Sequence, residues 1–320
     1  MDPTPQEAAG VARALRSRRT IPVGWEPVTT GGHTPARRWV VRLEDRRTVF
    51  AKVATDELTA SWLRDEHVAY SVLRGSAFMP AYVGWYDDGS RPVLILEDLS
   101  AAAWAPPWDD ARIGAVLACL QAVAATRPPA GLPRADDDHL ELREGWDEVE
   151  RDPTTFLALG LCSPEWLRTH LATLLEAAHA APLSGEALLH FDVRSDNVCF
   201  RADGSAVLVD WNWTSIGNPE IDAAFWLPSL ESEGGPQPDA VLPEVSPELA
   251  ACWAGYLGLA CGQGADPLCA ACPRGSASTD TVGLAVGRSA PRDPMDRLGR
   301  LLHLQHAATL RSWSRPRPQT

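Results

Sequence analysis

Short runs of alternating hydrophobic and polar residues fill the first third of the chain, and this period-two pattern predicts β-strands. The predicted strands are Trp25–Thr29, Arg37–Leu43, Thr48–Val53, Ala81–Tyr86 and Val93–Leu96. One helix interrupts them after the third strand: Thr55 or Asp56 is suited to cap it, and its apolar positions continue to about Leu73. The predicted order of elements is therefore β-β-β-α-β-β.

The rest of the chain has the longer period of amphipathic helices. Helices are predicted at Ala111–Ala125, Pro164–Ala180, Pro247–Ala260 and Met295–Trp313. A single strand-like segment, Ala187–Asp210, lies between them. A sheet-rich segment followed by a helical one predicts an α+β protein with two lobes: a small antiparallel β-sheet lobe with one helix over residues 1–98, and a larger, mainly helical lobe over residues 99–320.

Charge and composition narrow the classes of function. The net charge of −13 argues against a nucleic-acid-binding protein, which needs a basic face, and fits a cationic or Mg²⁺-chelated substrate. No apolar run approaches the roughly 18 residues that a transmembrane helix requires. The first residues lack the pattern of a signal peptide, so a cytoplasmic protein is expected. Of the seven cysteines, Cys261, Cys269 and Cys272 form a cluster, which we interpret as ordinary thiols in preference to a zinc site.

The most informative motif begins at His190 and has the form H-x-D-x4-N, with Asp192 and Asn197 at its other two fixed positions. A turn follows, and then an apolar strand that ends at Asp210. Phosphoryl transfer from ATP needs a carboxylate to accept the proton of the attacking hydroxyl, and oxygen ligands to hold Mg²⁺ against the phosphates. A base and an amide on one loop, with a second carboxylate at the end of the returning strand, would converge on one site. His190 would brace the loop.

This motif resembles the catalytic and metal-binding loops of the aminoglycoside phosphotransferase family, relatives of choline and fructosamine kinases and more distantly of protein kinases. The resemblance implies a protein-kinase-like fold with two lobes. It also implies that Asp192 is the catalytic base and that Asn197 and Asp210 bind magnesium. The stretch Ile216–Ala224 is similar to the family's G-[DN]-P-x-x-D-[LA]-A pattern, which implies that Asp222 braces the catalytic loop. The chain departs from the family at Phe191, where many members carry glycine.

Lys52 provides an independent argument, because the other 28 of the 29 basic residues are arginines. This lysine lies in the third predicted strand, where the family carries a lysine for the α- and β-phosphates of the nucleotide. In the following helix Glu66 is the polar member of an otherwise apolar stripe. Because a buried carboxylate needs a cation, we predict that Glu66 pairs with Lys52, with Glu57 as an alternative partner.

Two further segments are expected at the nucleotide. Gly31 and Gly32 lie between the first two predicted strands, where kinase-like folds cover the phosphates, although any hairpin turn uses glycine. By the same likeness the Leu96 carbonyl and the Asp98 amide would bind the edge of adenine. An ordinary strand end accounts for these two residues equally well.

The acceptor is suggested by an acidic stretch, Asp136–Asp152, with nine acidic residues and two arginines. In the resembling family such residues bind polyamine sugars, so Asp136, Asp137 and Asp138 are candidate substrate ligands. A solvated helix face would look the same. The leading hypothesis is a phosphotransferase that uses ATP (or GTP) and Mg²⁺ to modify an aminoglycoside or a related antibiotic. A metabolic kinase for an amino alcohol, sugar or glycated amine, and an inactive kinase-like binding module, are the alternatives.

Overall fold

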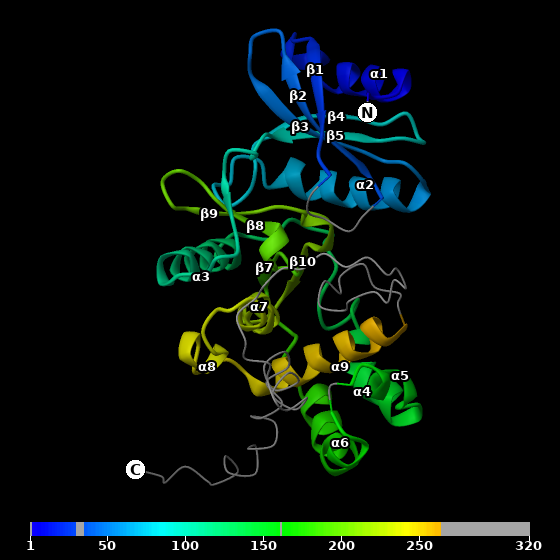
Figure 1. Ribbon diagram of the computed structural model, residues 1–320, viewed down its shortest axis with the longest axis vertical. Coiled ribbons are helices and arrows are strands. Elements are labelled where there is room, and N and C mark those ends of the chain that lie inside the picture. The colour runs from blue at the N-terminus through cyan, green and yellow to red at the C-terminus, as the bar shows by residue number, and fades with distance from the viewer. Residues whose placement is uncertain (1, 30–34, 161, 264–320) are drawn as a thin grey trace, which may run out of the picture. The chain divides into compact units, whose positions relative to one another are not determined.

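The computed structural model describes residues 2–29, 35–160 and 162–263, with side chains up to residue 258. These residues form two compact units, one containing residues up to 138 together with 183–235, and the other containing 139–182 and 236–263. The predicted α+β class is confirmed by a five-stranded antiparallel sheet and a set of helices (Figure 1). The predicted boundary between residues 98 and 99 stays a prediction.

The sheet of the first unit has the strand order β1-β2-β3-β5-β4, and all neighbours are antiparallel. Its strands are β1 (Pro22–Pro27), β2 (Arg37–Leu43), β3 (Thr48–Val53), β4 (Tyr82–Tyr86) and β5 (Val93–Glu97). The bounds of β2 and β3 match the prediction. The prediction for β1, Trp25–Thr29, started and ended too late: it left out the first residue of the strand, Pro22, although it included Pro27. An edge strand tolerates proline, since one side of its backbone pairs with no neighbour.

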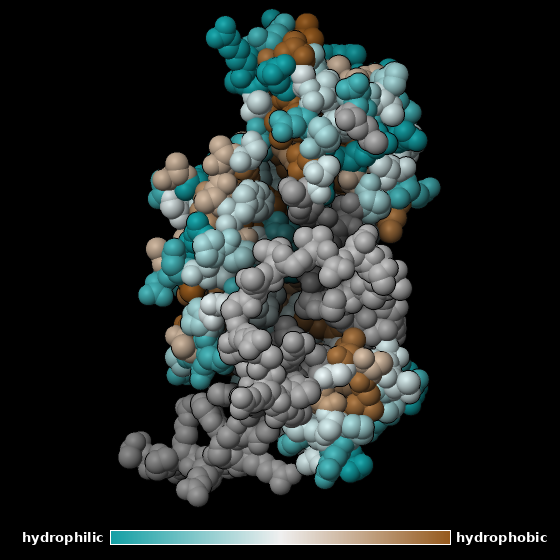
Figure 2. Space-filling model, viewed as in Figure 1, coloured by the Kyte–Doolittle hydropathy of each residue, from teal (hydrophilic) through white to brown (hydrophobic). Residues whose placement is uncertain are grey.

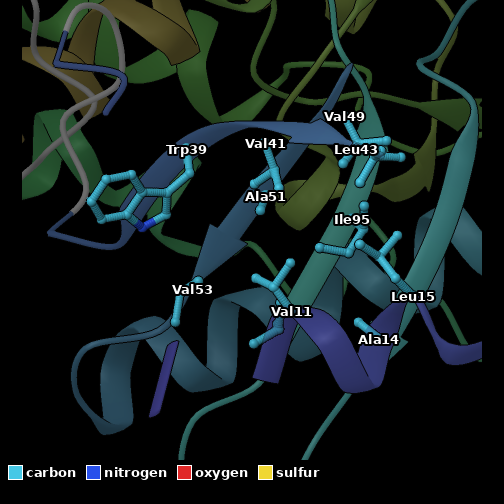
Figure 3. Packing of buried hydrophobic residues seen from close by; sticks show 11 residues of the cluster. Val11, Ala14, Leu15, Trp39, Val41, Leu43, Val49, Ala51, Val53 and Ile95 are labelled. Carbon is cyan, nitrogen blue, oxygen red and sulfur yellow. The ribbon is translucent and has the colours of Figure 1, made fainter. Parts of the chain in front are cut away.

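One face of the sheet packs against helix α1 (Pro5–Ala14). Val11 and Leu15 of this N-terminal segment contact the inward side chains of β2 and β3, among them Val41 and Ala51, in a buried cluster (Figure 3). The predicted order of elements lacked α1. The corrected order is α-β-β-β-α-β-β. The apolar positions of α1 are mostly alanines, so the hydrophobic periodicity of this helix is a weak signal. The missed signal is the capping box of Thr4 and Glu7.

Helix α2 (Glu57–Val72) covers the opposite face of the same sheet (Figure 1). Asp56 is its N-cap and accepts a hydrogen bond from the Thr59 amide, as one of the two predicted caps. The stripe predicted to be buried is buried throughout: Leu63, Glu66, Tyr70 and Leu73. A glutamate therefore points inward on this helix.

The remaining elements of the first unit form two smaller sheets and two helices. The sheets have the orders β6-β8-β9 and β10-β7. The elements are β6 (Ala103–Trp104), α3 (Asp110–Ala124), β7 (Ala187–Leu189), β8 (Val198–Phe200), β9 (Ala206–Leu208), β10 (Ser215–Gly217) and α7 (Ile221–Ser232), with short 3₁₀ turns at η1 (Arg16–Arg18), η2 (Ser195–Asn197) and η3 (Trp211–Trp213). Helix α7 was not predicted, because it is buried on almost every side and so shows no polar period.

The second unit is helical, with α4 (Glu141–Arg151), α5 (Thr154–Ala158), α6 (Pro164–His179), α8 (Pro238–Val241) and α9 (Pro247–Gln263). Trp146 on α4 is buried, and its Nε1 donates a hydrogen bond to the Ala251 carbonyl of α9 at 2.8 Å. Helix α4 was missed because it lies inside the acidic stretch. The predicted helix Met295–Trp313, together with Cys269 and Cys272 and the side chain of Cys261, lies outside the described residues.

The surface is mixed in character. Hydrophilic residues dominate the face seen in Figure 2, with some hydrophobic residues exposed near the upper end, in the region of β1 and β2. Ile21 and Val23, at this edge of the sheet, are more than half exposed. Within the described part of the chain, none of the helices has the length and apolar character needed to cross a membrane.

Candidate active site

Lys52 joins two carboxylates that come from different parts of the first unit. Its Nζ lies 2.8 Å and 2.9 Å from the two carboxylate oxygens of Glu66, and 2.8 Å from Oδ1 of Asp210. The Lys52 side chain is 12% exposed and that of Glu66 only 2%. Strand β3, helix α2 and the end of the β8–β9 hairpin thus converge, as the sequence analysis expected of Lys52 and Glu66.

The Lys52 ammonium and the Asp210 carboxylate hold each other ionised. Burial alone would lower the pKa of Lys52, but the carboxylates of Asp210 and Glu66 outweigh it and raise that pKa. Burial alone would raise the pKa of Asp210, but the Lys52 ammonium holds it below its ordinary value. Glu66 is the weaker acid, because burial raises its pKa to about 7. Lys52 therefore stays a cation.

His190 braces the loop that follows β7. Its ring is fully buried, and Nε2 lies 2.9 Å from the Val209 carbonyl, which can only accept a hydrogen bond. The Asp192 amide donates to Nδ1 at 3.3 Å. These two partners fix the neutral ring with its proton on Nε2, and burial lowers the pKa of His190 to about 4. The ring ties the loop to the end of β9.

Asp222, at the start of α7, holds the same loop by its backbone. Its two carboxylate oxygens accept hydrogen bonds from the amides of His190, at 2.8 Å, and Phe191, at 2.7 Å. This grip holds Phe191 at a φ of 69°, in the left-handed region that favours glycine. Because Asp222 is buried, its pKa rises to about 6 in spite of these two donors. The contacts are those expected of a brace.

Asp192 lies beyond this turn with both carboxylate oxygens in contact with side chains. The amide of Asn197 donates to Oδ2 at 2.8 Å and to the Asp192 carbonyl at 2.9 Å. Nε of Arg194 lies 3.0 Å from Oδ1. Burial raises the pKa of Asp192 to about 7, and Arg194 opposes this rise. A buried carboxylate that titrates near neutral pH is suited to accept a proton from a hydroxyl.

Arg194 is the residue of this site that the sequence analysis missed. Its guanidinium is mostly buried and also lies 3.4 Å from Oδ2 of Asp196. The signal in the sequence was only the presence of an arginine between Asp192 and Asn197. In the structure, extended backbone at Arg194 places its long cationic side chain beside the carboxylate two residues earlier. Residue spacing alone does not reveal which way such a side chain turns.

Asn197 and Asp210, the expected magnesium ligands, come from neighbouring segments. The Val209 amide donates to the Asn197 carbonyl at 2.9 Å, which ties η2 to the residue before Asp210. Asp210 has a φ of 69°, so the chain turns sharply after the strand. With the Asn197 amide nitrogen donating to Asp192, its oxygen remains as an acceptor. One amide and one carboxylate oxygen fit Mg²⁺, which takes one or two protein ligands and completes its shell with phosphate and water.

Among the described residues, no group of three or more His, Cys, Asp or Glu side chains forms a metal site by itself. A metal ion at Asn197 and Asp210 would therefore need ligands from phosphate or water. A small pocket is lined by Lys52, Glu66, Asp210 and Asn212, among others. A larger cavity of about 210 Å³ lies between α1 and strands β3 to β5, and none of the predicted site residues lines it. The site is thus marked by its side-chain chemistry and not by cavity size.

The residues expected at adenine lie where β5 ends. Leu96 is buried in the strand, and the Asp98 carboxylate accepts a hydrogen bond from the Ser100 amide at 2.9 Å. Between them, Glu97 forms a two-pronged ion pair with Arg201, just after β8, which holds the end of β5 near the β8–β9 hairpin. The adenine contacts stay a prediction. Gly31 and Gly32 lie outside the described residues.

Two of the three aspartates expected at the substrate are engaged in local contacts. Asp136 accepts a hydrogen bond from the Ser184 hydroxyl, and Asp138 accepts one from the Arg134 amide at 2.6 Å. Asp137 is exposed. Asp136 and Asp138 therefore shape a turn, and Asp137 is the one of the three best placed to meet a ligand from solution.

Comparisons with known proteins identify a family and a fold for this chain. The model of the phosphotransferase enzyme family (APH) matches residues 20–252. No curated protein matches the sequence. The solved structure of macrolide 2′-phosphotransferase type I is 15% identical, with 82% of this chain and 91% of the other covered and a TM-score of 0.53. A thermostable mutant of aminoglycoside phosphotransferase APH(4)-Ia, in a ternary complex with AMP-PNP and hygromycin B, is 17% identical, with coverages of 82% and 91% and a TM-score of 0.52. At such identities the likeness concerns the fold.

Proposed function

The chain belongs to the phosphotransferase enzyme family, and from this premise we propose that it transfers the γ-phosphate of ATP to a hydroxyl of a small cationic molecule, such as an aminoglycoside or a related antibiotic. The observation that carries the proposal is the contact of Lys52 with both Glu66 and Asp210, which joins strand β3 to a residue 158 positions later. The predicted family resemblance is confirmed. The AMP-PNP bound in the similar APH(4)-Ia structure supports ATP as the donor.

Lys52 would bind the α- and β-phosphates, as a compact ammonium already held in place by two carboxylates. Lys52 belongs to a cluster of four carboxylates and three cations linked by ion pairs and electrostatic interactions: Glu66, Asp192, Asp196, Asp210, Arg38, Lys52 and Arg194. When all four acids are ionised they outnumber the three cations, and the side chains alone then favour a cation and disfavour a triphosphate. Mg²⁺, held by Asn197 and Asp210, would supply the missing positive charge and neutralise the phosphates.

Asp192 would act as the base. A phosphoryl transfer requires that the acceptor hydroxyl lose its proton, and a carboxylate with a pKa of about 7 takes up that proton near neutral pH. His190 and Asp222 position it, because they hold the backbone on both sides of the turn that carries it. Neither needs to touch the substrate.

A cationic acceptor is supported by charge. The net charge of −13 draws cations toward the protein, and Asp137 is exposed within the acidic stretch. Because Asp136 and Asp138 already have partners, we expect Asp137 to contribute most of any attraction from this turn.

The proposal is tested with the purified chain, Mg²⁺ and ATP, and a panel of acceptors. The panel contains aminoglycosides including hygromycin B, macrolides, cationic peptide antibiotics, small amino alcohols and glycated amines. ADP release is followed together with the mass of the acceptor. We expect the gain of one phosphoryl group on an antibiotic with several amines. Transfer only to an amino alcohol or glycated amine would indicate a metabolic kinase.

Asp192→Asn is the matched variant, because it keeps the shape of the side chain and removes its basicity. It should lower turnover about 100- to 10,000-fold, the usual contribution of a general base, while nucleotide binding persists. ATP binding without transfer to any acceptor in the wild-type chain would support an inactive binding module instead.

A further inference from the structure

Arg38 lies directly opposite Lys52 in the sheet. The register of β2 and β3 pairs these two residues, so their side chains emerge on the same face. The neighbours Trp39 and Ala51 point to the other face and pack toward α1 (Figure 3). Arg38 is therefore a second cation on the sheet face that carries the ion pairs of Lys52.

The guanidinium of Arg38 has a shielded donor without an acceptor. Its side chain is partly buried, and its Nε is hidden from solvent yet makes no hydrogen bond to any residue that the structure describes. Other arginines of this unit have carboxylate partners: Arg64 pairs with Asp87, and Arg201 with Glu97. A desolvated donor without an acceptor is costly, so such a donor in a candidate active site points to a ligand.

The charges around Arg38 indicate what that ligand is. Burial lowers the pKa of Arg38, while the carboxylates of Asp210 and Asp196 raise it, so these acids lie within electrostatic reach. Neither of them accepts a hydrogen bond from the shielded Nε. A simple anion would be repelled by the two acids. An anion that carries a divalent cation, with oxygens for the guanidinium and a metal for the carboxylates, satisfies both sides.

We propose that Arg38 binds a phosphate group of the nucleotide donor and is a second phosphate-binding cation beside Lys52. This inference rests on the proposed function, which supplies the nucleotide. The planar guanidinium offers two parallel N–H donors to phosphate oxygens, whereas Lys52 acts as a point charge that its carboxylates keep in place. The two cations have different roles, because Lys52 is fixed before the nucleotide arrives and Arg38 gains its phosphate partner only on binding.

The test compares the binding of adenosine, ADP and ATP, each with MgCl₂, to the wild-type chain, Arg38→Met and Arg42→Met. Arg42 is the matched control, because it lies on the same face of the same strand, opposite Thr48 and away from Lys52. For Arg38→Met we expect the affinity for ADP and for ATP to fall about 10- to 100-fold, as for a lost pair of charge-assisted hydrogen bonds, with adenosine unchanged. Arg42→Met should bind all three as the wild type does.

Thermal unfolding without nucleotide separates binding from a structural role. An arginine whose donors find acceptors only in the nucleotide complex contributes little to the stability of the free protein. Arg38→Met should therefore unfold at the wild-type temperature or above it. An unchanged ratio of ADP to adenosine affinity in Arg38→Met would overturn the inference, as would an equal loss of affinity for adenosine. A wild-type chain that binds ADP no better than adenosine would overturn the proposed donor itself.

Discussion

Nε of Arg194 lies 3.0 Å from Oδ1 of Asp192, so the expected base is buried beside a cation only two residues further along the chain. Burial raises the pKa of Asp192 to about 7, and Arg194 is the main group that opposes the rise. The two largest influences on the strength of the base are thus desolvation, which raises its pKa, and one guanidinium, which lowers it.

The first prediction concerns this balance. The base must be ionised, so kcat/KM should fall as the pH drops through about 7, where Asp192 becomes protonated. Arg194→Met removes the cation that lowers this pKa, and the acidic limb of the pH–rate profile should move to higher pH. Arg194→Lys retains a positive charge and should move it less. An acidic limb that stays in place in Arg194→Met would contradict the role given to Arg194.

The second prediction concerns the backbone at Phe191, whose φ is 69°. A residue other than glycine costs about 1–2 kcal/mol in this region. Phe191→Gly and Phe191→Ala both lose the buried ring and its contact with Phe225, and both should be less stable than the wild type. Glycine alone relieves the backbone, so Phe191→Gly should be the more stable of the two by about 1 kcal/mol in urea denaturation. If Phe191→Ala were instead more stable than Phe191→Gly, the backbone at residue 191 would not be strained.

The third prediction concerns Asp222. Asp222→Ala leaves the buried amides of His190 and Phe191 without acceptors, at a cost of about 1–3 kcal/mol each. Asp222→Asn retains one carbonyl oxygen and should recover part of the loss. Both variants should also lower kcat, because the turn before Asp192 loses its support. Equal urea midpoints for the wild type and Asp222→Ala would show that the two amides find other partners.

The sheet was largely predictable from the sequence, and the reason lies in its strands. In β2 and β3 one face packs against α1 while the other carries polar residues such as Arg38 and Lys52, so hydrophobic and polar positions alternate. Helix α7 lacks such contrast, because it carries few polar residues. Helix α4 has it, since Leu142, Trp146 and Val149 lie on one buried face, but it was missed because its many acidic residues were interpreted as a substrate-binding or solvated stretch. Periodicity finds elements that are buried on one side only.

The candidate site was predictable where the chemistry restricts residue type. The contact of Lys52 with Glu66 follows the expectation from a lone lysine and a glutamate in an apolar stripe, whereas the contact of Lys52 with Asp210, which was expected as a magnesium ligand, was not predicted. Arginines offered no such contrast, because 28 of them are present in the chain. Arg38 and Arg194 stand out only when the register of two strands and the direction of one side chain are known.

The fourth prediction concerns Lys52 as the shared partner of two carboxylates. Removing one partner of a buried ion pair costs about 3–5 kcal/mol, because the remaining charge stays desolvated. Lys52→Met should therefore destabilise the chain by about this amount in urea denaturation, since Glu66 and Asp210 then face each other without a cation. In Lys52→Met, the further change Glu66→Gln removes one of the two charges and should restore part of the stability. If Glu66→Gln lowered the stability of Lys52→Met further, the pair would not be coupled.

Lys52→Arg separates the charge of this residue from its shape. A guanidinium is larger and planar, and the space between Glu66 and Asp210 holds an ammonium at 2.8 Å from each carboxylate. The variant should remain folded, because a cation is still present, while kcat/KM falls about 100-fold, the loss expected when reacting groups are displaced by about 1 Å. Acylation at alkaline pH gives an independent measurement, because only the deprotonated amine reacts, the pKa of Lys52 is raised by Asp210 and Glu66, and Lys52 is the only lysine in the chain. Modification should abolish activity, Mg²⁺ with ATP should protect against it, and the label should be found on Lys52 and the N-terminal amine. Full activity of Lys52→Arg, or inactivation that Mg²⁺ and ATP leave unaffected, would show that Lys52 does not bind the nucleotide.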